Sequence, residues 1–315
     1  MSTDRGRHRT ESDPGRGRPT ALAIVATVIF VVAVVVAIGV VVPRLTRSKP
    51  DDPAKPAAVA QPATRARPTE QAVPIPSQLA TDYESLAAGV NAQIGMAFAP
   101  VGRPEAVEAL GQWSDGPAWS TIKVPLSVAL LRETGEGPVT SDIRAAITAS
   151  DNAAAQAIWD QLGAHRTAAE KVEAVLATAG EAVEVNSEVT RPGFSASGQT
   201  QWSLADQARY LAHAACDPQA KPVLDLMGEI VTSQRWGLGN VDGARFKGGW
   251  GPGPDGRYLV RQYGLISGPH GDVAVAIAGV ASSGGFADGT AVLSRISEWL
   301  GDHAAELPSG GCPAG

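Results

Sequence analysis

The stretch Ala118-Trp-Ser-Thr-Ile-Lys-Val-Pro-Leu-Ser127 places Ser120 and Lys123 at the start of an apolar run. Residues three apart on a helix lie on the same face. A helix N-terminus also offers unpaired N–H groups and the positive end of the helix dipole. A serine that attacks a carbonyl needs a nearby amine and such donors, so this pair is a candidate nucleophile and base. Taken alone, the pattern is more often a capping serine followed by a solvated lysine.

Two further motifs follow along the chain. Ser150-Asp-Asn152 lies between two helical stretches. It is either a set of helix caps or a catalytic turn, in which Ser150 relays a proton to the leaving group and Asn152 binds the substrate amide. Lys247-Gly-Gly249 ends a strand-like stretch. It is either a strand-end turn with an exposed lysine, or a positive charge beside glycines that let a ligand approach closely.

The order of these motifs is more specific than any one of them. Ser-x-x-Lys, then Ser-Asp-Asn, then Lys-Gly before two further strands and a terminal helix resembles the serine β-lactamases and penicillin-binding proteins. The resemblance is closest to the class A β-lactamases and covers about residues 79–302. It implies an α+β fold with an antiparallel sheet built by both ends of the domain.

The resemblance also implies a role for each matching residue. Ser120 forms the acyl-enzyme, with Lys123 as its base or proton shuttle, and Lys247 holds the substrate carboxylate. The backbone N–H groups of Ser120 and Trp250 form the oxyanion hole. Substrate-binding positions are Gly249 and, as a second carboxylate partner, Arg261. Trp119 and Trp250 either line the pocket or pack in the core.

Three departures from the family pattern are visible. Gly248 stands where the family has Thr or Ser, so a hydroxyl that helps bind the substrate carboxylate is missing. Ser120 and Ser150 are unusually close in sequence, which predicts a reduced helical half. The deacylating glutamate of the family is not evident, because Glu184 and Glu188 are candidates but neither has Asn four residues later.

The N-terminal part of the chain reads as a membrane anchor. Residues 1–20 are Arg-rich and predict a disordered cytoplasmic tail. Residues 21–42 carry no charge, and 22 residues of helix span about 33 Å, enough for one transmembrane helix. Residues 43–77 contain eight prolines and predict an extended extracytoplasmic linker. The expected location is the plasma membrane, with the domain of residues 78–315 outside the cell.

Apolar periodicity predicts a block of helices flanked by strands. Helices are expected at 79–88, 121–133, 143–149, 152–162, 168–179, 204–215, 290–300 and between 218 and 231. Strands are expected around 94–98, at 106–113 as a hairpin partner, and at 244–250, 258–266 and 273–281. Runs of strands separated by helices, without βαβ repeats, indicate an α+β domain.

The cysteines, the histidines and the net charge bear on three further questions: a disulfide, a metal site and nucleic-acid binding. An outward-facing domain with two cysteines favours a Cys216–Cys312 disulfide over two free thiols. The five histidines show no metal-ligand spacing, so neither a metal nor another cofactor is predicted. A net charge of −6 gives no sign of nucleic-acid binding. The GxGxxG pattern at 251–256 contains two prolines and precedes a strand, which argues against a nucleotide site.

Two functions are therefore expected from the sequence. The first is an acyl-enzyme-forming serine hydrolase, a monomer acting on β-lactams or on D-Ala-type peptidoglycan peptides, with slow deacylation. The second is a cell-envelope binding or scaffold protein that keeps the fold without efficient chemistry. Gly248, the short helical half and the missing glutamate favour the second. The first is favoured by five side chains that match the family motifs: Ser120, Lys123, Ser150, Asn152 and Lys247.

Overall fold

The computed structural model describes residues 77–135 and 139–313. The predictions for the tail at 1–20, the membrane span at 21–42 and the linker up to residue 76 lie outside the described residues. Within the described ranges, no helix combines the length and the apolar character that a membrane crossing requires.

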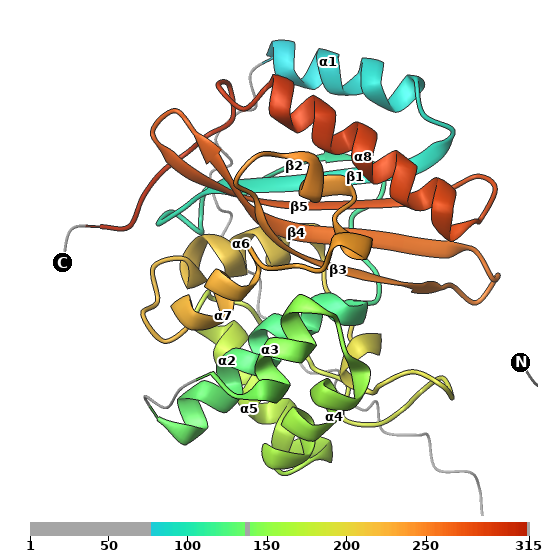
Figure 1. Ribbon diagram of the computed structural model, residues 1–315. Coiled ribbons are helices and arrows are strands. Elements are labelled where there is room, and N and C mark those ends of the chain that lie inside the picture. Colours follow the sequence, from blue (N-terminus) through green and yellow to red (C-terminus); the bar gives the residue numbers. More distant parts are fainter. Residues whose placement is uncertain (1–76, 136–138, 314–315) are drawn as a thin grey trace, which may run out of the picture. The chain divides into compact units, whose positions relative to one another are not determined.

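A five-stranded antiparallel sheet forms the centre of the domain (Figure 1). Its strands are β1 Ala92–Pro100, β2 Glu108–Gly111, β3 Arg245–Pro252, β4 Tyr258–Gly268 and β5 Gly271–Ala281. Their order is β2-β1-β5-β4-β3, so strands from the two ends of the domain lie side by side. The predicted α+β class, with a sheet completed by both ends of the domain, is confirmed.

Side chains of different size alternate on the two faces of β1 and β5. The alanines at 274, 276 and 278 of β5 face one core, and the Val, Val and Ile at 273, 275 and 277 face the other. On β1, Ala97 and Ala99 join the first core and Met96 and Phe98 the second. Successive residues of a strand point to opposite faces, so this period of two gives the sheet one close-packing face and one bulky face.

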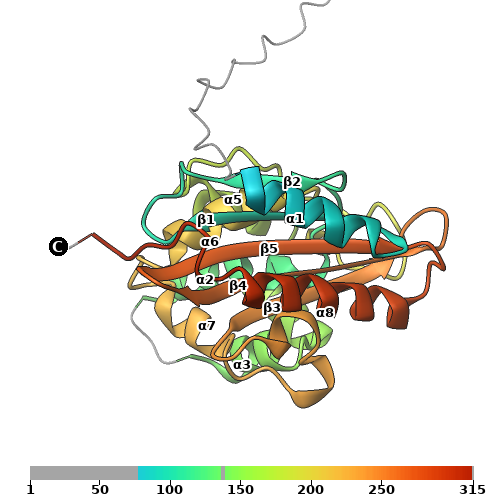
Figure 2. The ribbon, with the colours of Figure 1, turned by 90° about the horizontal axis from the view of Figure 1, so that it is seen from above.

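Helices cover both faces of the sheet (Figures 1 and 2). On the bulky face lie α1 Ser77–Ala88 and α8 Phe286–Asp302. On the alanine face, α6 Leu204–Ala214 packs against β1 and β5, where the small side chains allow a close approach. The remaining helices complete this half: α2 Lys123–Thr134, α3 Ser141–Thr148, α4 Asn152–Gln161, α5 His165–Ala177 and α7 Lys221–Leu226.

The predicted elements are present, with three differences. The segment before Lys123 is a 3-10 turn, η1 Trp119–Ile122, and not the first turn of the α-helix. The expected strand at 106–113 is reduced to the four residues of β2. The helix expected between 218 and 231 is only the six residues of α7, which ends in tight turns at Met227 and Gly228; glycine is a poor helix former.

The predicted disulfide is present in the structure. Cys216, just after α6, is bonded to Cys312 in the C-terminal tail, with the two Cα atoms 5.2 Å apart. The tail is also held by the pairing of Asp272 with Gly310. The disulfide therefore fastens the end of the chain to the helical half across 96 residues of sequence.

Candidate active site

Ser120 lies in the short turn η1 beneath the edge strand β3. Trp119, the residue before it, has φ of 49°, a left-handed conformation that costs energy in a non-glycine residue. The backbone of β3 approaches this turn so closely that a Cβ on Gly249 would lie 2.8 Å from the Ser120 nitrogen. A Cβ on Gly251 would lie 2.6 Å from the Trp119 ring. Both glycines are therefore required by the contact between strand and turn.

Lys123 begins α2 and joins the other motifs through its ammonium group. Its Nζ donates to the Ser150 carbonyl oxygen at 2.6 Å and to Asn152 Oδ1 at 2.7 Å. The Ser150 hydroxyl is 3.4 Å from the same Nζ. Burial lowers the pKa of Lys123 to about 8, and the negative charge of Asp151 opposes this shift. A lysine with a pKa near neutrality is suited to accept and return protons.

Lys247 reaches the same serine from β3. Its Nζ is 2.9 Å from Ser150 Oγ and donates to the Gly248 carbonyl at 3.0 Å. The side chain is fully buried, and burial together with repulsion from Lys123 holds the pKa of Lys247 well below its usual range. The Ser150 hydroxyl thus lies between two lysine amines, a position from which it can pass a proton.

The turn between α3 and α4 sets the positions of Ser150 and Asn152. Ser150 has φ of 58°, also left-handed, and Asp151 caps α4 by accepting a hydrogen bond from Ala154 N at 2.8 Å. Asp151 is therefore a helix cap, which was one of the two predictions for this motif. That prediction does not extend to Ser150 and Asn152, whose side chains meet Lys123.

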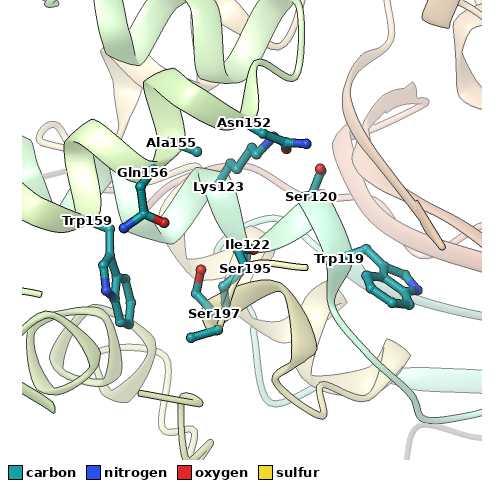
Figure 3. A pocket seen from close by; sticks show the side chains of 11 residues that line it. Trp119, Ser120, Ile122, Lys123, Asn152, Ala155, Gln156, Trp159, Ser195 and Ser197 are labelled. Atoms are coloured by element: carbon teal, nitrogen blue, oxygen red, sulfur yellow. The ribbon is translucent and has the colours of Figure 1, made fainter. Parts of the chain in front are cut away.

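Two adjoining cavities open at Ser120, and Figure 3 shows the side chains that line the smaller one. A small one of about 30 Å³, large enough for a water molecule, is lined by polar side chains that include Lys123, Asn152, Gln156 and Ser197. A wider one of about 390 Å³ is lined by Trp119, Ser120, Asn152, Gln156, Val189, Gly193, Phe194, Ser195, Gly198 and Trp250. Among the described residues, no carboxylate lines either cavity.

Three of the residues predicted for the site lie elsewhere. Arg261 is fully buried, and its guanidinium donates to carbonyl oxygens beneath the nucleophile turn, so it is not available to bind a substrate carboxylate. Glu188 is exposed and pairs with His165 at 2.9 Å. Glu184 lines a separate surface hollow with Asp115 and Asp206. The sequence indicated Glu184 and Glu188 only by their position in the chain, and neither side chain lines a cavity at Ser120, although Val189 beside Glu188 does.

Gly248 differs from the two glycines that the strand contact requires. A Cβ at this position would have its nearest neighbour, an atom of the Trp236 ring, at 3.5 Å, which is ordinary contact. A side chain at 248 is therefore compatible with the packing, and the absence of a hydroxyl there has no steric cause.

Three residues that close the small cavity were not predicted from the sequence: Gln156, Ser195 and Ser197. Gln156 follows Asn152 by one helical turn on α4, so its spacing could have placed it beside the motif. Ser195 and Ser197 come from the loop before α6, and no pattern in the sequence marks them. Figure 3 shows Gln156 on the side of Lys123 away from Trp119, with Ser195 and Ser197 below Lys123.

Sequence comparison finds no relative: no family model matches the chain, and neither does any curated protein. Solved structures do match. A class A β-lactamase from Bacteroides cellulosilyticus is 16% identical, with a TM-score of 0.57 over 73% of this chain and 98% of that one. A β-lactamase from Chitinophaga pinensis is 16% identical (TM-score 0.56, 72% and 99% covered), as is the TLA-3 extended-spectrum β-lactamase (0.56, 72% and 98%). The domain therefore has the fold of the class A serine β-lactamases, as the order of the three motifs predicted.

Proposed function

We propose that this protein is an acyl-enzyme-forming serine hydrolase with Ser120 as its nucleophile. The observation that carries the proposal is that three separate motifs meet around Ser150, beside a cavity onto which Ser120 opens. Ser120 and Asn152 line it, and Lys123 and Lys247 meet at the Ser150 hydroxyl. Capping residues and solvated lysines would have no reason to share partners across 97 residues of sequence.

The proposed reaction begins with the neutral amine of Lys123 taking the proton of Ser120. The serine oxygen attacks the substrate carbonyl, and the N–H groups of Ser120 and Trp250 stabilise the oxyanion. The C–N bond then breaks as Ser150 delivers a proton to the leaving nitrogen. Ser150 regains a proton through the lysines, and the acyl group stays on Ser120 as an ester.

The substrates we propose are β-lactams or D-Ala-type peptidoglycan peptides. The family that this order of motifs resembles, the serine β-lactamases and penicillin-binding proteins, acts on these two classes of compound. The structurally similar TLA-3 protein is an extended-spectrum β-lactamase, which supports a β-lactam as the first compound to try. In this scheme Asn152 binds the substrate amide and Gly249 belongs to the substrate-binding strand. Lys247, buried behind Ser150, attracts the substrate carboxylate through its charge.

Slow deacylation is part of the proposal. Hydrolysis of the acyl-enzyme needs a base for the attacking water. No carboxylate lines either cavity at Ser120 among the described residues, and Lys123 is the one ionisable side chain in the lining of the small cavity. We therefore expect an acyl-enzyme that forms and persists.

We further propose that the chain is a monomer anchored in the plasma membrane. Residues 21–42 would form the span, with the N-terminus in the cytoplasm and residues 43–77 as a tether. A protease-protection assay on intact cells tests this orientation: cleavage of the catalytic domain only after lysis would contradict it.

A second function, binding without chemistry, is favoured by one specific observation. Position 248 has room for a side chain but carries none, so the carboxylate-binding hydroxyl is absent without a packing reason. A scaffold protein of this kind would bind cell-wall peptides without a covalent adduct.

The deciding experiment uses the full-length protein in mild detergent, incubated with a penicillin and with a cephalosporin. Intact-mass spectrometry follows the adduct over time, with Ser120→Ala as the control. An adduct that requires Ser120 supports the hydrolase, and its lifetime reports deacylation. No adduct with either drug or with D-Ala peptides would leave the binding function as the better account.

A further inference from the structure

Arg261 is a fully buried arginine in the middle of β4, on the face of the sheet toward the nucleophile turn. It lies opposite Gly249 in the β3–β4 pairing, and directly opposed residues share a face. Its guanidinium donates at 2.9 Å to both Gly116 O and Pro117 O, at 2.8 Å to Trp202 O, and at 2.7 Å to Gln207 Oε1.

The positive charge of Arg261 has no close carboxylate partner. No ion pair joins it to an acid within the described part of the chain. Burial lowers its pKa to about 9, and the negative charge of Asp115 opposes this shift. The guanidinium carbon lies 5.3 Å from the centre of the Trp113 ring, and three backbone carbonyls and the Gln207 amide oxygen accept its hydrogen bonds. Burying a charge in this way is costly. Because this burial is costly, we expect its benefit in the segment that accepts the hydrogen bonds of the guanidinium.

That segment is the chain on either side of Ser120. Gly116 and Pro117 come directly before the turn. On the other side, Gln207 Nε2 donates to Thr121 Oγ1 at 2.7 Å, and this hydroxyl donates to Ala118 O. Arg261 therefore reaches the residues before Ser120 directly and the residue after it through Gln207.

The turn needs such support because its backbone is strained. The left-handed conformation of Trp119 persists only where its surroundings fix it. The contact of Gly251 with the Trp119 ring fixes one side. The Arg261–Gln207–Thr121 chain fixes the other, from beneath the turn and away from the substrate cavities, neither of which these residues line.

We propose that Arg261 and Gln207 are positioning residues, which hold the strained turn so that the Ser120 hydroxyl faces Lys123 and the substrate. The proposal rests on the proposed function of Ser120 as a nucleophile. It replaces the expected role of Arg261 in binding the substrate carboxylate.

The sharpest test is Gln207→Glu in the full-length protein. The new carboxylate keeps the bond to Arg261 and neutralises its charge, so the melting temperature should not fall. The carboxylate cannot donate a hydrogen bond to Thr121. The Thr121 hydroxyl therefore donates to the carboxylate, and its hydrogen bond to Ala118 O is lost. We expect the rate constant for acylation by benzylpenicillin to fall by about 10-fold or more, since displacements of about 1 Å can cost 10²-fold. The half-saturating drug concentration should stay within about 3-fold.

Two controls separate positioning from general effects. Gln219→Glu adds the same charge at an exposed site and should acylate at the wild-type rate. Thr121→Ser keeps both hydrogen bonds and should retain the rate, whereas Thr121→Val removes them and should not. If Gln207→Glu does not fold, this Thr121 pair decides the question.

Hydrogen–deuterium exchange of residues 116–122 gives a readout that does not depend on acylation. Exchange in this segment should be faster in Gln207→Glu than in the wild-type protein, with the rest of the domain unchanged. If Gln207→Glu acylates and exchanges at the same rates as the wild-type protein, Arg261 and Gln207 do not position the turn. If even the wild-type protein forms no adduct, the proposed function fails, and exchange alone decides whether the turn is held in this way.

Discussion

Replacing Gly249 by alanine tests the contact between β3 and the nucleophile turn. The new Cβ would lie 2.8 Å from Ser120 N, 2.9 Å from Ala118 O and 3.0 Å from Thr121 N. Non-bonded atoms of this kind prefer about 3.5 Å or more, so the strand and the turn must separate by about 0.5 to 0.7 Å. All three atoms are backbone, and no side-chain rotation can relieve the clash.

The expected effect of Gly249→Ala on catalysis follows from that displacement. A shift of about 1 Å in a reacting group can cost 10²-fold, so the acylation rate constant should fall by about 10- to 100-fold. Overpacking of this kind typically costs about 1–3 kcal/mol of stability. For a domain of this size, that corresponds to a fall in melting temperature of about 2 to 12 °C.

Gly248→Ala is the matched control, one residue away on the same strand. Its Cβ would find its nearest neighbours at 3.5 and 3.7 Å, so the strand has no need to move. Gly→Ala at a compatible position stabilises by about 0.4–1 kcal/mol, and acylation should stay within about 3-fold of wild type. Stopped-flow acylation and thermal unfolding of the two variants provide the comparison. If Gly249→Ala acylates as fast as Gly248→Ala, the close contact does not position the nucleophile.

Three further predictions concern proton transfer, deacylation and stability. Because Lys123 must be neutral to take a proton and its pKa is about 8, acylation should rise with pH through about 8 and then level off; a flat profile between pH 6 and 9 would exclude it as the base. Gln156→Glu places a carboxylate at the small cavity, and Asp160→Asn in the same variant removes the acid beside it. The new base should shorten the adduct lifetime about 10-fold or more, as measured by intact mass. An unchanged lifetime would show that the missing base is not the cause of slow deacylation. Replacing both Cys216 and Cys312 by serine opens a 96-residue loop and should lower the unfolding free energy by about 4 to 5 kcal/mol in urea without changing acylation, and an unchanged urea midpoint would contradict this.

The sequence predicted the fold well where one physical pattern dominates. Alternating apolar residues identified the long strands, and amphipathic spacing identified the helices from 143 to 215. The prediction was weakest for η1 and α7, where tertiary contacts decide between 3-10 and α-helical geometry. At η1, the close approach of β3 and the hydrogen bonds beneath the turn determine the backbone, and neither leaves a local signature.

Residues of the site were predictable to the extent that they belong to motifs. Ser120, Lys123, Ser150, Asn152 and Lys247 converge in the structure. Arg261 was assigned to the substrate because it follows the Lys-Gly motif on the next strand. Its position in the sequence gives its strand but not the depth of its side chain, and only the packing shows that its donors are used below the turn. Glu184 and Glu188 could not be placed because they lie in a long segment without periodicity.

The pairing of β1 with β5 has a consequence for how this chain reaches its native state. Ala92 meets Ala281, so the central pair of strands joins residues separated by most of the described domain. A ribosome synthesises the first strand long before its main partner, and until then β1 can pair only with the short β2. Contacts so distant in sequence slow folding and leave apolar strands uncovered for longer. Nascent chains of this protein should therefore remain unfolded until synthesis is nearly complete and should depend on chaperones in the meantime.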